Sequence, residues 1–406
     1  MRYVSTDPSA IVSRMMDKFN FYEFFAGGGM ARAGLGAGWN CLFANDISSM
    51  KAQAYRANWG EADLVCGDVA DVAAASLPGT AGLAWASFPC QDLSLAGNGK
   101  GLGHAEAAHN TRSGAFWPFW TLVQHLLRDN RAPRMIVLEN VPGVLTSHKG
   151  ADFAAICAAL AQAGYAFGAM AIDARLFVPQ SRQRVFIVAV RRDHPVPARL
   201  LSEGPRSPWH PRALVCGHAG LPGEVKSRWL WWNMPVPSPR TSVLANLIEE
   251  HPASVAWHTA AQTQGLLGLM SPANLAKVAV ARMAGSEHVG CLYRRTRPGA
   301  GGQRLQRAEV RFDGIAGCLR TPGGGSSRQS IILVKGDSIR TRLLSTKEAA
   351  RLMGLSESYR LPDRYNDAYH VAGDGVCVPV VRYLARHVLE PVLAADRCRA
   401  SLMAAE

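Results

Sequence analysis

The sequence lacks any long apolar segment. No stretch of the chain approaches the roughly 20 consecutive apolar residues that a membrane-spanning helix requires. The first 17 residues also lack the long apolar core of a signal peptide. We therefore expect a cytoplasmic protein with no membrane partner.

Closely spaced cysteine pairs are missing too. The nine cysteines are scattered along the chain without a Cys-x-x-Cys motif, and their odd number does not suit a complete disulfide framework. This distribution predicts a reducing compartment, mostly structural thiols and no metal site.

Acidic residues are outnumbered. The chain of 406 residues has 44 Lys and Arg against 31 Asp and Glu, which gives a formal net charge of +13. Such an excess favours a polyanionic partner, nucleic acid first, although a surplus spread over the whole surface for solubility would give the same number. The length is compatible with two domains, and the 48% hydrophobic content supplies a sizeable core.

Strand-like and helix-like segments alternate over residues 19–190, which predicts an α/β fold with a doubly wound, mostly parallel sheet. The pattern ends near residue 191, where Pro, Gly and Trp become frequent and arginines follow. A helical pattern resumes near residue 342 with a capping box at Ser345 to Glu348. We expect a catalytic domain formed by 1–190 and 335–406, interrupted by a smaller irregular domain at 191–334. The expected strands are 19–25, 41–44, 82–86, 135–138 and 185–190, and the expected helices are 30–35, 48–57, 116–127, 153–163 and 379–393.

Cys90 follows the apolar run 82–86, which reads as a buried strand, and therefore lies where open α/β sheets bind their ligands. Pro89 restricts the backbone just before the thiol. A buried structural cysteine is the alternative interpretation.

A glycine-rich turn, Phe25-Ala26-Gly27-Gly28-Gly29, connects the first strand to the first helix, where a ligand could approach the backbone. Its spacing is not Gly-x-Gly-x-x-Gly and no Gly-Lys-Ser/Thr follows, which disfavours dinucleotide and P-loop sites. Asp46, at the next strand end, could accept hydrogen bonds from ribose hydroxyls, and Asp68 from an adenine amino group. A tight turn and two helix caps would explain the same residues.

Glu139 follows another apolar strand, where partial desolvation would raise its pKa and let it donate a proton to a ring nitrogen. Arg182 and Arg184 lie two residues apart before the strand 185–190 and could face one pocket. A cap or salt bridge for Glu139, and solvated arginines, are the alternatives.

Together these segments resemble the DNA (cytosine-5)-methyltransferase family across nearly the whole chain. The turn is similar to the family's cofactor-binding first motif, and Ser87 to Gln91 to its Pro-Cys motif. Glu139-Asn140-Val141 is similar to the Glu-Asn-Val motif, residues 180–184 to the Gln-x-Arg-x-Arg motif, and 342–354 to the ninth motif. The order and spacing of the five motifs agree with the family.

The resemblance implies transfer of a methyl group from S-adenosyl-L-methionine to C5 of a cytosine in a specific sequence of double-stranded DNA, with the base flipped out and Cys90 bound to C6. Glu139 would hold N3 and N4, Arg184 would hydrogen-bond O2, Arg182 would support the loop, and positive surroundings would help Cys90 to ionise. The 191–334 insert would recognise the DNA sequence, with Thr321 as a candidate contact, and a glycine-rich loop at 97–114 would close over the base. The implied cofactor-binding residues are Phe25, Ala26, Gly27, Gly28, Gly29, Asp46, Ile47, Asp68, Val69, Pro89, Asp374 and Val376.

Two departures from the family pattern stand out. Asp374 occupies a position where the family usually has Asn, so the carboxylate keeps the acceptor but loses the amide donor. Glu23 and Met30 stand where Asp and Gly are frequent.

Three alternative functions remain open at this stage. A transfer-RNA cytosine methyltransferase usually has a smaller recognition region, and the intact motifs argue against a binding module without catalysis. A thiol hydrolase would need a partner for Cys90 such as His104 or His109. For the leading interpretation we expect a monomer, and possibly a cognate restriction endonuclease that acts separately.

Overall fold

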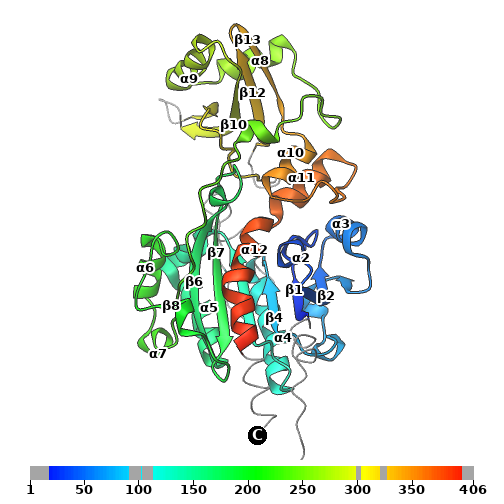
Figure 1. Ribbon diagram of the computed structural model, residues 1–406, viewed down its shortest axis with the longest axis vertical. Coiled ribbons are helices and arrows are strands. Elements are labelled where there is room, and N and C mark those ends of the chain that lie inside the picture. The colour runs from blue at the N-terminus through cyan, green and yellow to red at the C-terminus, as the bar shows by residue number, and fades with distance from the viewer. Residues whose placement is uncertain (1–17, 91–101, 103–112, 299–302, 321–326, 396–406) are drawn as a thin grey trace, which may run out of the picture.

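A computed structural model describes residues 18–90, 102, 113–298, 303–320 and 327–395. Its larger sheet has seven strands in the order β3-β2-β1-β4-β5-β7-β6 (Figure 1). The first five run parallel, whereas β7 is antiparallel to both β5 and β6. The predicted fold class is therefore confirmed. The strands are β1 (Phe19–Phe24), β2 (Trp39–Asp46), β3 (Leu64–Cys66), β4 (Leu83–Ala86), β5 (Met135–Asn140), β6 (Tyr165–Asp173) and β7 (Gln183–Arg191).

Helices cover both faces of this sheet, and all five expected helices are present within a few residues of their predicted ends. Buried apolar side chains form one cluster on each face, which is why β4 and β5 read as continuous apolar runs in the sequence. The helices of this part are α2 (Met30–Leu35), α3 (Ser49–Trp59), α4 (Phe116–Arg128), α5 (Ala151–Gln162) and α12 (Val378–Leu384), the last continuing through a π-helical turn (Ala385–Leu389).

The C-terminal helix α12 packs against α2, as expected for a segment that returns to the first domain (Figure 1). The contact is close at Gly34, where an added Cβ would lie 2.4 Å from the Cβ of Val381. Between α12 and the second domain lie α10 (Thr346–Leu352) and α11 (Tyr365–Asp374). The capping box predicted for α10 is present, with Ser345 as N-cap and Glu348 at its third residue.

The second sheet corrects the expectation of an irregular domain. It has four antiparallel strands in the order β11-β10-β12-β13, packed against two helices. Sequence periodicity missed β10 and β11 because exposed arginines interrupt their apolar residues. The elements are α8 (Ala260–Gly268), α9 (Pro272–Met283), β10 (His288–Pro298), β11 (Arg304–Arg311), β12 (Ser330–Lys335) and β13 (Ser338–Leu343).

The expected domain boundaries do not coincide with the change from one sheet to the other. Residues after 191 still pack on the seven-stranded sheet through two tryptophans: Trp229 forms an isolated bridge with Phe167, and the buried Trp232 donates from Nε1 to the Val188 carbonyl at 3.2 Å. At the other end, β13 pairs with β12 beyond residue 334. The short elements on the first sheet are β8 (Leu201–Ser202), α6 (Arg212–Ala219), α7 (Gly223–Lys226) and β9 (Trp231–Trp232).

None of the helices in the described part of the chain combines the length and the apolar character that crossing a bilayer requires.

Candidate active site

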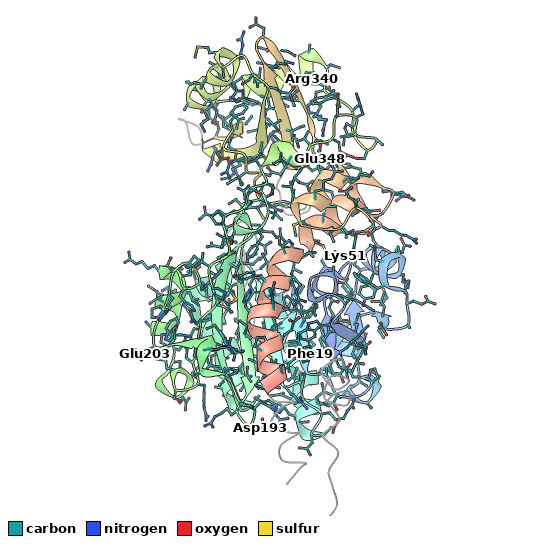
Figure 2. All side chains as sticks on the ribbon, viewed as in Figure 1. Phe19, Lys51, Asp193, Glu203, Arg340 and Glu348 are labelled. Carbon is teal, nitrogen blue, oxygen red and sulfur yellow. The ribbon has the colours of Figure 1, made fainter. Side chains whose placement is uncertain are left out.

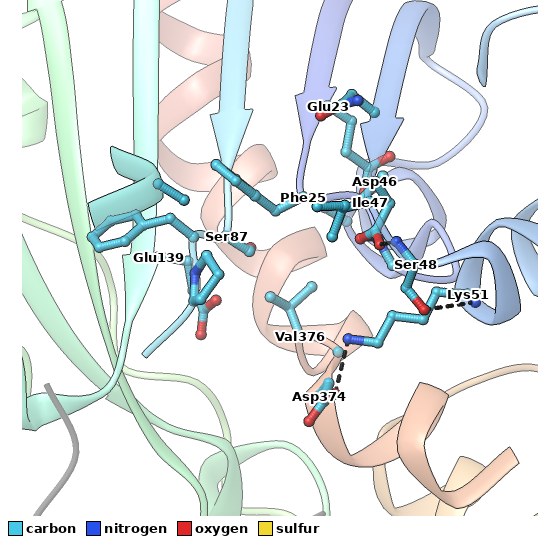
Figure 3. A pocket seen from close by; sticks show the side chains of 18 of the residues that line it. Glu23, Phe25, Asp46, Ile47, Ser48, Lys51, Ser87, Glu139, Asp374 and Val376 are labelled. Carbon is cyan, nitrogen blue, oxygen red and sulfur yellow. Dashed lines mark hydrogen bonds and ion pairs between the residues drawn. The ribbon is translucent and has the colours of Figure 1, made fainter. Parts of the chain in front are cut away.

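A cavity of about 700 Å³ lies at the carboxyl ends of the parallel strands (Figure 3). The turn after β1, the ends of β2, β4 and β5, the start of β7 and the end of α11 all contribute to its wall. This is the edge at which open α/β sheets bind ligands. The predicted site residues that line it are Phe25, Ala26, Gly27, Asp46, Ile47, Asp68, Val69, Pro89, Cys90, Glu139, Arg184, Asp374 and Val376.

Three predicted site residues do not line the cavity. Gly28 and Gly29 provide room for protein side chains, since an added Cβ would lie 2.2 Å from the Tyr359 hydroxyl and 2.3 Å from Trp59 Nε1, respectively. The carbonyl of Gly28 accepts hydrogen bonds from both of these side chains, at 2.7 and 3.2 Å. The two glycines therefore position the turn, while Gly27 brings its backbone to the cavity. The third residue, Arg182, lies behind the wall.

Cys90 is positioned by the loop that follows β4, and this loop is tied to β5. The Asn140 amide donates to the Phe88 carbonyl at 3.1 Å, which fixes the backbone two residues before the thiol. Burial raises the pKa of Cys90; Arg184 and Arg182 oppose this effect, whereas the negative charges of Glu139 and Asp374 add to it. The arginines thus favour ionisation, as expected, but desolvation of the thiolate outweighs them and the net shift of the pKa is upward.

Glu139 is the next-to-last residue of β5 and forms an ion pair with Arg184 near the start of β7, with 3.1 Å between Oε1 and Nε. The antiparallel pairing of β5 and β7 brings these two ends together. Their side chains are only 8% and 16% exposed. The expected burial of Glu139 and the expected salt bridge, which the sequence offered as alternatives, occur together.

Arg182 connects three segments that are distant in the sequence. Its guanidinium donates to the carbonyls of Leu319 at 3.2 Å and Gly375 at 2.7 Å, and contacts Cys318 Sγ at 3.5 Å. Gln180 extends the connection, since its side chain accepts from the Leu319 amide at 3.2 Å and donates to the Leu352 carbonyl at 2.8 Å. The loop between β11 and β12 is therefore fastened to the wall of the cavity.

Both aspartates at the strand ends bond backbone amides. Asp46 accepts from Gly27 at 2.8 Å and from Ser48 at 2.8 Å, so it holds the glycine turn and the start of α3 together. Asp68 caps the short helix Val69–Asp71 by accepting from Ala70 at 3.0 Å. These structural roles do not remove the side chains from the cavity, because both line it.

Two ionisable residues of the cavity, Lys51 and Glu23, were not predicted as site residues from the sequence. Lys51, in the first turn of α3, forms an ion pair with Asp374 at 2.8 Å (Figure 3). Glu23 is buried at the end of β1 with no hydrogen-bond partner for Oε2, and burial raises its pKa from 4.5 to about 8. The available signal for Lys51 was its place in the first turn of the helix that follows Asp46, the carboxylate at the end of β2.

Other predicted features lie outside the described residues, namely His104, His109, Thr321 and almost all of the 97–114 loop. Among the residues that are described, no group of three or more His, Cys, Asp or Glu side chains could hold a metal ion.

The geometry agrees with comparisons to known proteins. A family model described as C-5 cytosine-specific DNA methylase matches residues 19–390. The chain is 26% identical to the Type II methyltransferase M.NlaX of Neisseria lactamica over 91% of this chain and 96% of the relative. It is 23% identical to M.HhaI of Haemophilus parahaemolyticus, over 93% and 96%. The fold is similar to that in the crystal structure of the S. pombe Dnmt2 methyltransferase, with a TM-score of 0.54 at 17% identity, covering 92% of this chain and 99% of that one.

Proposed function

The chain belongs to the C-5 cytosine-specific DNA methylase family and is a DNA cytosine-5-methyltransferase. From this premise we propose that it methylates one cytosine within a specific sequence of duplex DNA. In the proposed mechanism the cytosine is flipped out of the duplex and Cys90 attacks its C6 atom. The observation that carries the proposal is the shared cavity. Cys90 and the Glu139–Arg184 pair line it together with Asp46 and Asp68 of the neighbouring strand ends.

We propose S-adenosyl-L-methionine as the methyl donor bound in this cavity, and the residues present fit it. Gly27 has a φ of +57° and lines the cavity, so backbone reaches the ligand space without an intervening side chain. Ile47 is 68% exposed beside Asp46, which leaves an apolar surface for a purine next to an acceptor for ribose hydroxyls. When bound, the donor supplies the electrophilic methyl group that C5 accepts.

The residues around Cys90 have distinct tasks in this mechanism. Addition of the thiolate to C6 raises the electron density at C5, and Arg184 stabilises negative charge on the sulfur before attack. Glu139 holds N3 and N4 of the base and supplies a proton as charge develops on the ring, while Arg184 donates to O2. Arg182 acts indirectly, through the Leu319 and Gly375 carbonyls, to keep this wall in place. Removal of the C5 proton and release of Cys90 complete the reaction.

The covalent mechanism is tested by Cys90→Ala, with Cys216→Ala as the matched control because that thiol is exposed on α6. We expect Cys90→Ala to lose more than about a thousandfold in tritiated methyl transfer to duplex DNA, as deletion of a nucleophile does elsewhere. Cofactor-dependent trapping on duplex DNA with 5-fluorocytosine should also disappear. Undiminished transfer by Cys90→Ala would refute the assignment.

The substrate is tested separately. Methyl incorporation into duplex DNA and into transfer RNA should be measured side by side, and we expect DNA to be the preferred substrate. Bisulfite sequencing of DNA from cells that express the protein should then show one recurring sequence context. Methylation of transfer RNA in preference to DNA would favour the alternative within the family.

We further propose that the protein acts as a cytoplasmic monomer and that a cognate restriction endonuclease, if encoded, works separately. The Type II names of the relatives support a place in such a system. Size-exclusion chromatography with light scattering tests the monomer.

A further inference from the structure

The described wall of the cavity holds two cations, and each forms an ion pair with a carboxylate of the same wall. Of the described lining residues, only Lys51 and Arg184 carry a positive charge, and Arg184 is engaged by Glu139 at 3.1 Å. Lys51 is the other cation, and its partner is also a residue of the cavity wall. That partner is Asp374, at 2.8 Å.

The carboxylates of the cavity differ in how firmly their partners are held. Asp46 and Asp68 accept hydrogen bonds from backbone amides that cannot leave them. Glu23 accepts from the Arg32 amide, and Glu139 holds Arg184. Asp374, by contrast, contacts the end of a flexible lysine side chain. A ligand can displace this contact without breaking any backbone hydrogen bond.

The ion pair lies on the wall of the cavity. Lys51 comes from α3 and Asp374 from the end of α11, two helices that contact each other, and both side chains extend toward the cavity (Figure 3). Lys51 lies on the side of the first domain that faces α10 and α11 (Figure 2). The two side chains are 22% and 39% exposed, so a ligand can reach the pair. Because the pair is also partly desolvated, charged groups of a ligand would form strong hydrogen bonds with it.

We propose that Lys51 and Asp374 together select the amino-acid end of the methyl donor, Lys51 by binding its α-carboxylate and Asp374 its α-ammonium group. An α-amino acid presents one charge of each sign on neighbouring atoms, which matches a lysine and an aspartate already held side by side. When the ligand enters, each side chain exchanges the other for the complementary group of the zwitterion, and no charge is left without a partner. The Asp in place of the family's usual Asn thereby gains a function, because a neutral amide would not balance Lys51.

The inference rests on the proposed methyl donor, and equilibrium binding tests it without turnover. Calorimetric titration should use two probes, S-adenosylhomocysteine and 5′-methylthioadenosine, which shares the nucleoside and thioether but lacks the amino acid. For Lys51→Met we expect affinity for S-adenosylhomocysteine to fall about tenfold to a hundredfold, the effect of losing one charged hydrogen bond. Affinity for 5′-methylthioadenosine should change less than about twofold, which also shows that the variant is folded.

Two further variants sharpen the test. Lys51→Arg should restore most of the affinity for S-adenosylhomocysteine, whereas Lys335→Met, which removes an exposed lysine of β12, should match the wild type with both probes. Equal losses with both probes, or none, in Lys51→Met would overturn the inference. If the wild-type protein bound neither probe, the proposed methyl donor would fail instead, so the two failures are distinguishable.

Discussion

At the scale of single residues, two neighbours have opposite effects on the pKa of the Cys90 thiol. Burial raises the pKa of Cys90, Arg184 lowers it and Glu139 raises it. The two members of the Glu139–Arg184 ion pair therefore act in opposite directions on the equilibrium between the thiol and the thiolate of Cys90. A target base that takes hydrogen bonds from both would alter this balance when it arrives.

We predict that Arg184→Gln and Glu139→Gln shift the titration of Cys90 in opposite directions. Loss of the guanidinium removes a charge that stabilises the thiolate, so the pKa should rise further and iodoacetamide should react more slowly at a fixed mildly alkaline pH. Loss of the carboxylate should lower the pKa and speed the reaction. Mass spectrometry of the peptide that contains Cys90, at a series of pH values, measures both. Shifts of the same sign in the two variants would contradict the assignment.

Glu23 allows a prediction about stability. Its carboxyl keeps its proton up to a pH of about 8 in the folded protein but loses it near 4.5 when unfolded. Between these values the folded state binds more protons, so the free energy of unfolding falls as the pH rises. In Glu23→Gln this fall should be smaller by about 2–4 kcal/mol between about pH 5 and about pH 8, because each unit of pKa difference between the folded and unfolded states is worth about 1.4 kcal/mol.

Urea denaturation at about pH 5 and about pH 8 checks this difference. Glu61→Gln is the control, because that carboxylate is 81% exposed and should show the pH dependence of the wild type. An unchanged pH dependence in Glu23→Gln would show that another group is responsible.

At the scale of elements, the connection between the two sheets depends on short polar contacts. The loop after β11 pairs with the segment before β7, through a bridge between Ala316 and Gln180. The side chain of Gln180 is fully buried and bonds backbone groups on both sides of the junction. Each of those groups would be left without a partner if the amide were removed.

We predict that Gln180→Ala lowers the free energy of unfolding by about 1–3 kcal/mol and broadens the transition, because the junction loosens before either sheet melts. Gln183→Ala is a matched control in the same motif, since its side chain is exposed, and should cost less than about 0.5 kcal/mol. Thermal or urea unfolding followed by circular dichroism and tryptophan fluorescence compares them. Equal losses in the two variants would contradict the role of Gln180.

The elements that sequence reasoning identified share a physical cause. Strands β1, β4 and β5 are largely buried, so they could be recognised from their apolar residues, and Cys90 and Glu139 could be placed near the ends of β4 and β5. Strands β10 and β11 could not be recognised in this way, because their arginines face solvent and interrupt the apolar residues. The Lys51–Asp374 pair was also missed, since its members are distant in the chain and only the packing of α11 on α3 joins them.

At the scale of the whole molecule, several of the arginines lie on β10 and β11 of the second sheet. Arg295 of β10 lies directly opposite Arg307 of β11, and like charges in such a pair repel each other. Glu309 reaches Arg295 only at 3.7 Å. Phosphate groups of a bound duplex would relieve this repulsion, which fits the proposed recognition role of the second domain.

We predict that Arg307→Gln weakens DNA binding and lowers the slope of log affinity against log salt by about 0.9, the value for one phosphate contact. Its thermal stability without DNA should not fall, because a repulsive pair is removed. Arg199→Gln, on the first domain near Phe19, should leave the slope unchanged. Fluorescence anisotropy with a labelled duplex over a range of salt concentrations measures these slopes. An unaltered slope in Arg307→Gln would exclude this contact.

The packing of α12 on α2 has a consequence for the order in which the protein can mature during synthesis. One face of the first sheet emerges from the ribosome early, yet the helix that covers it near Gly34 and Val381 is translated only after the entire second domain. Apolar residues of α2 such as Met30 and Leu35, which are buried in the finished protein, therefore lack the cover of α12 until the second domain has been synthesised. All strands of the second sheet are therefore synthesised before α12, and the cavity cannot be complete until the end of α11 and the residues just after it have been made.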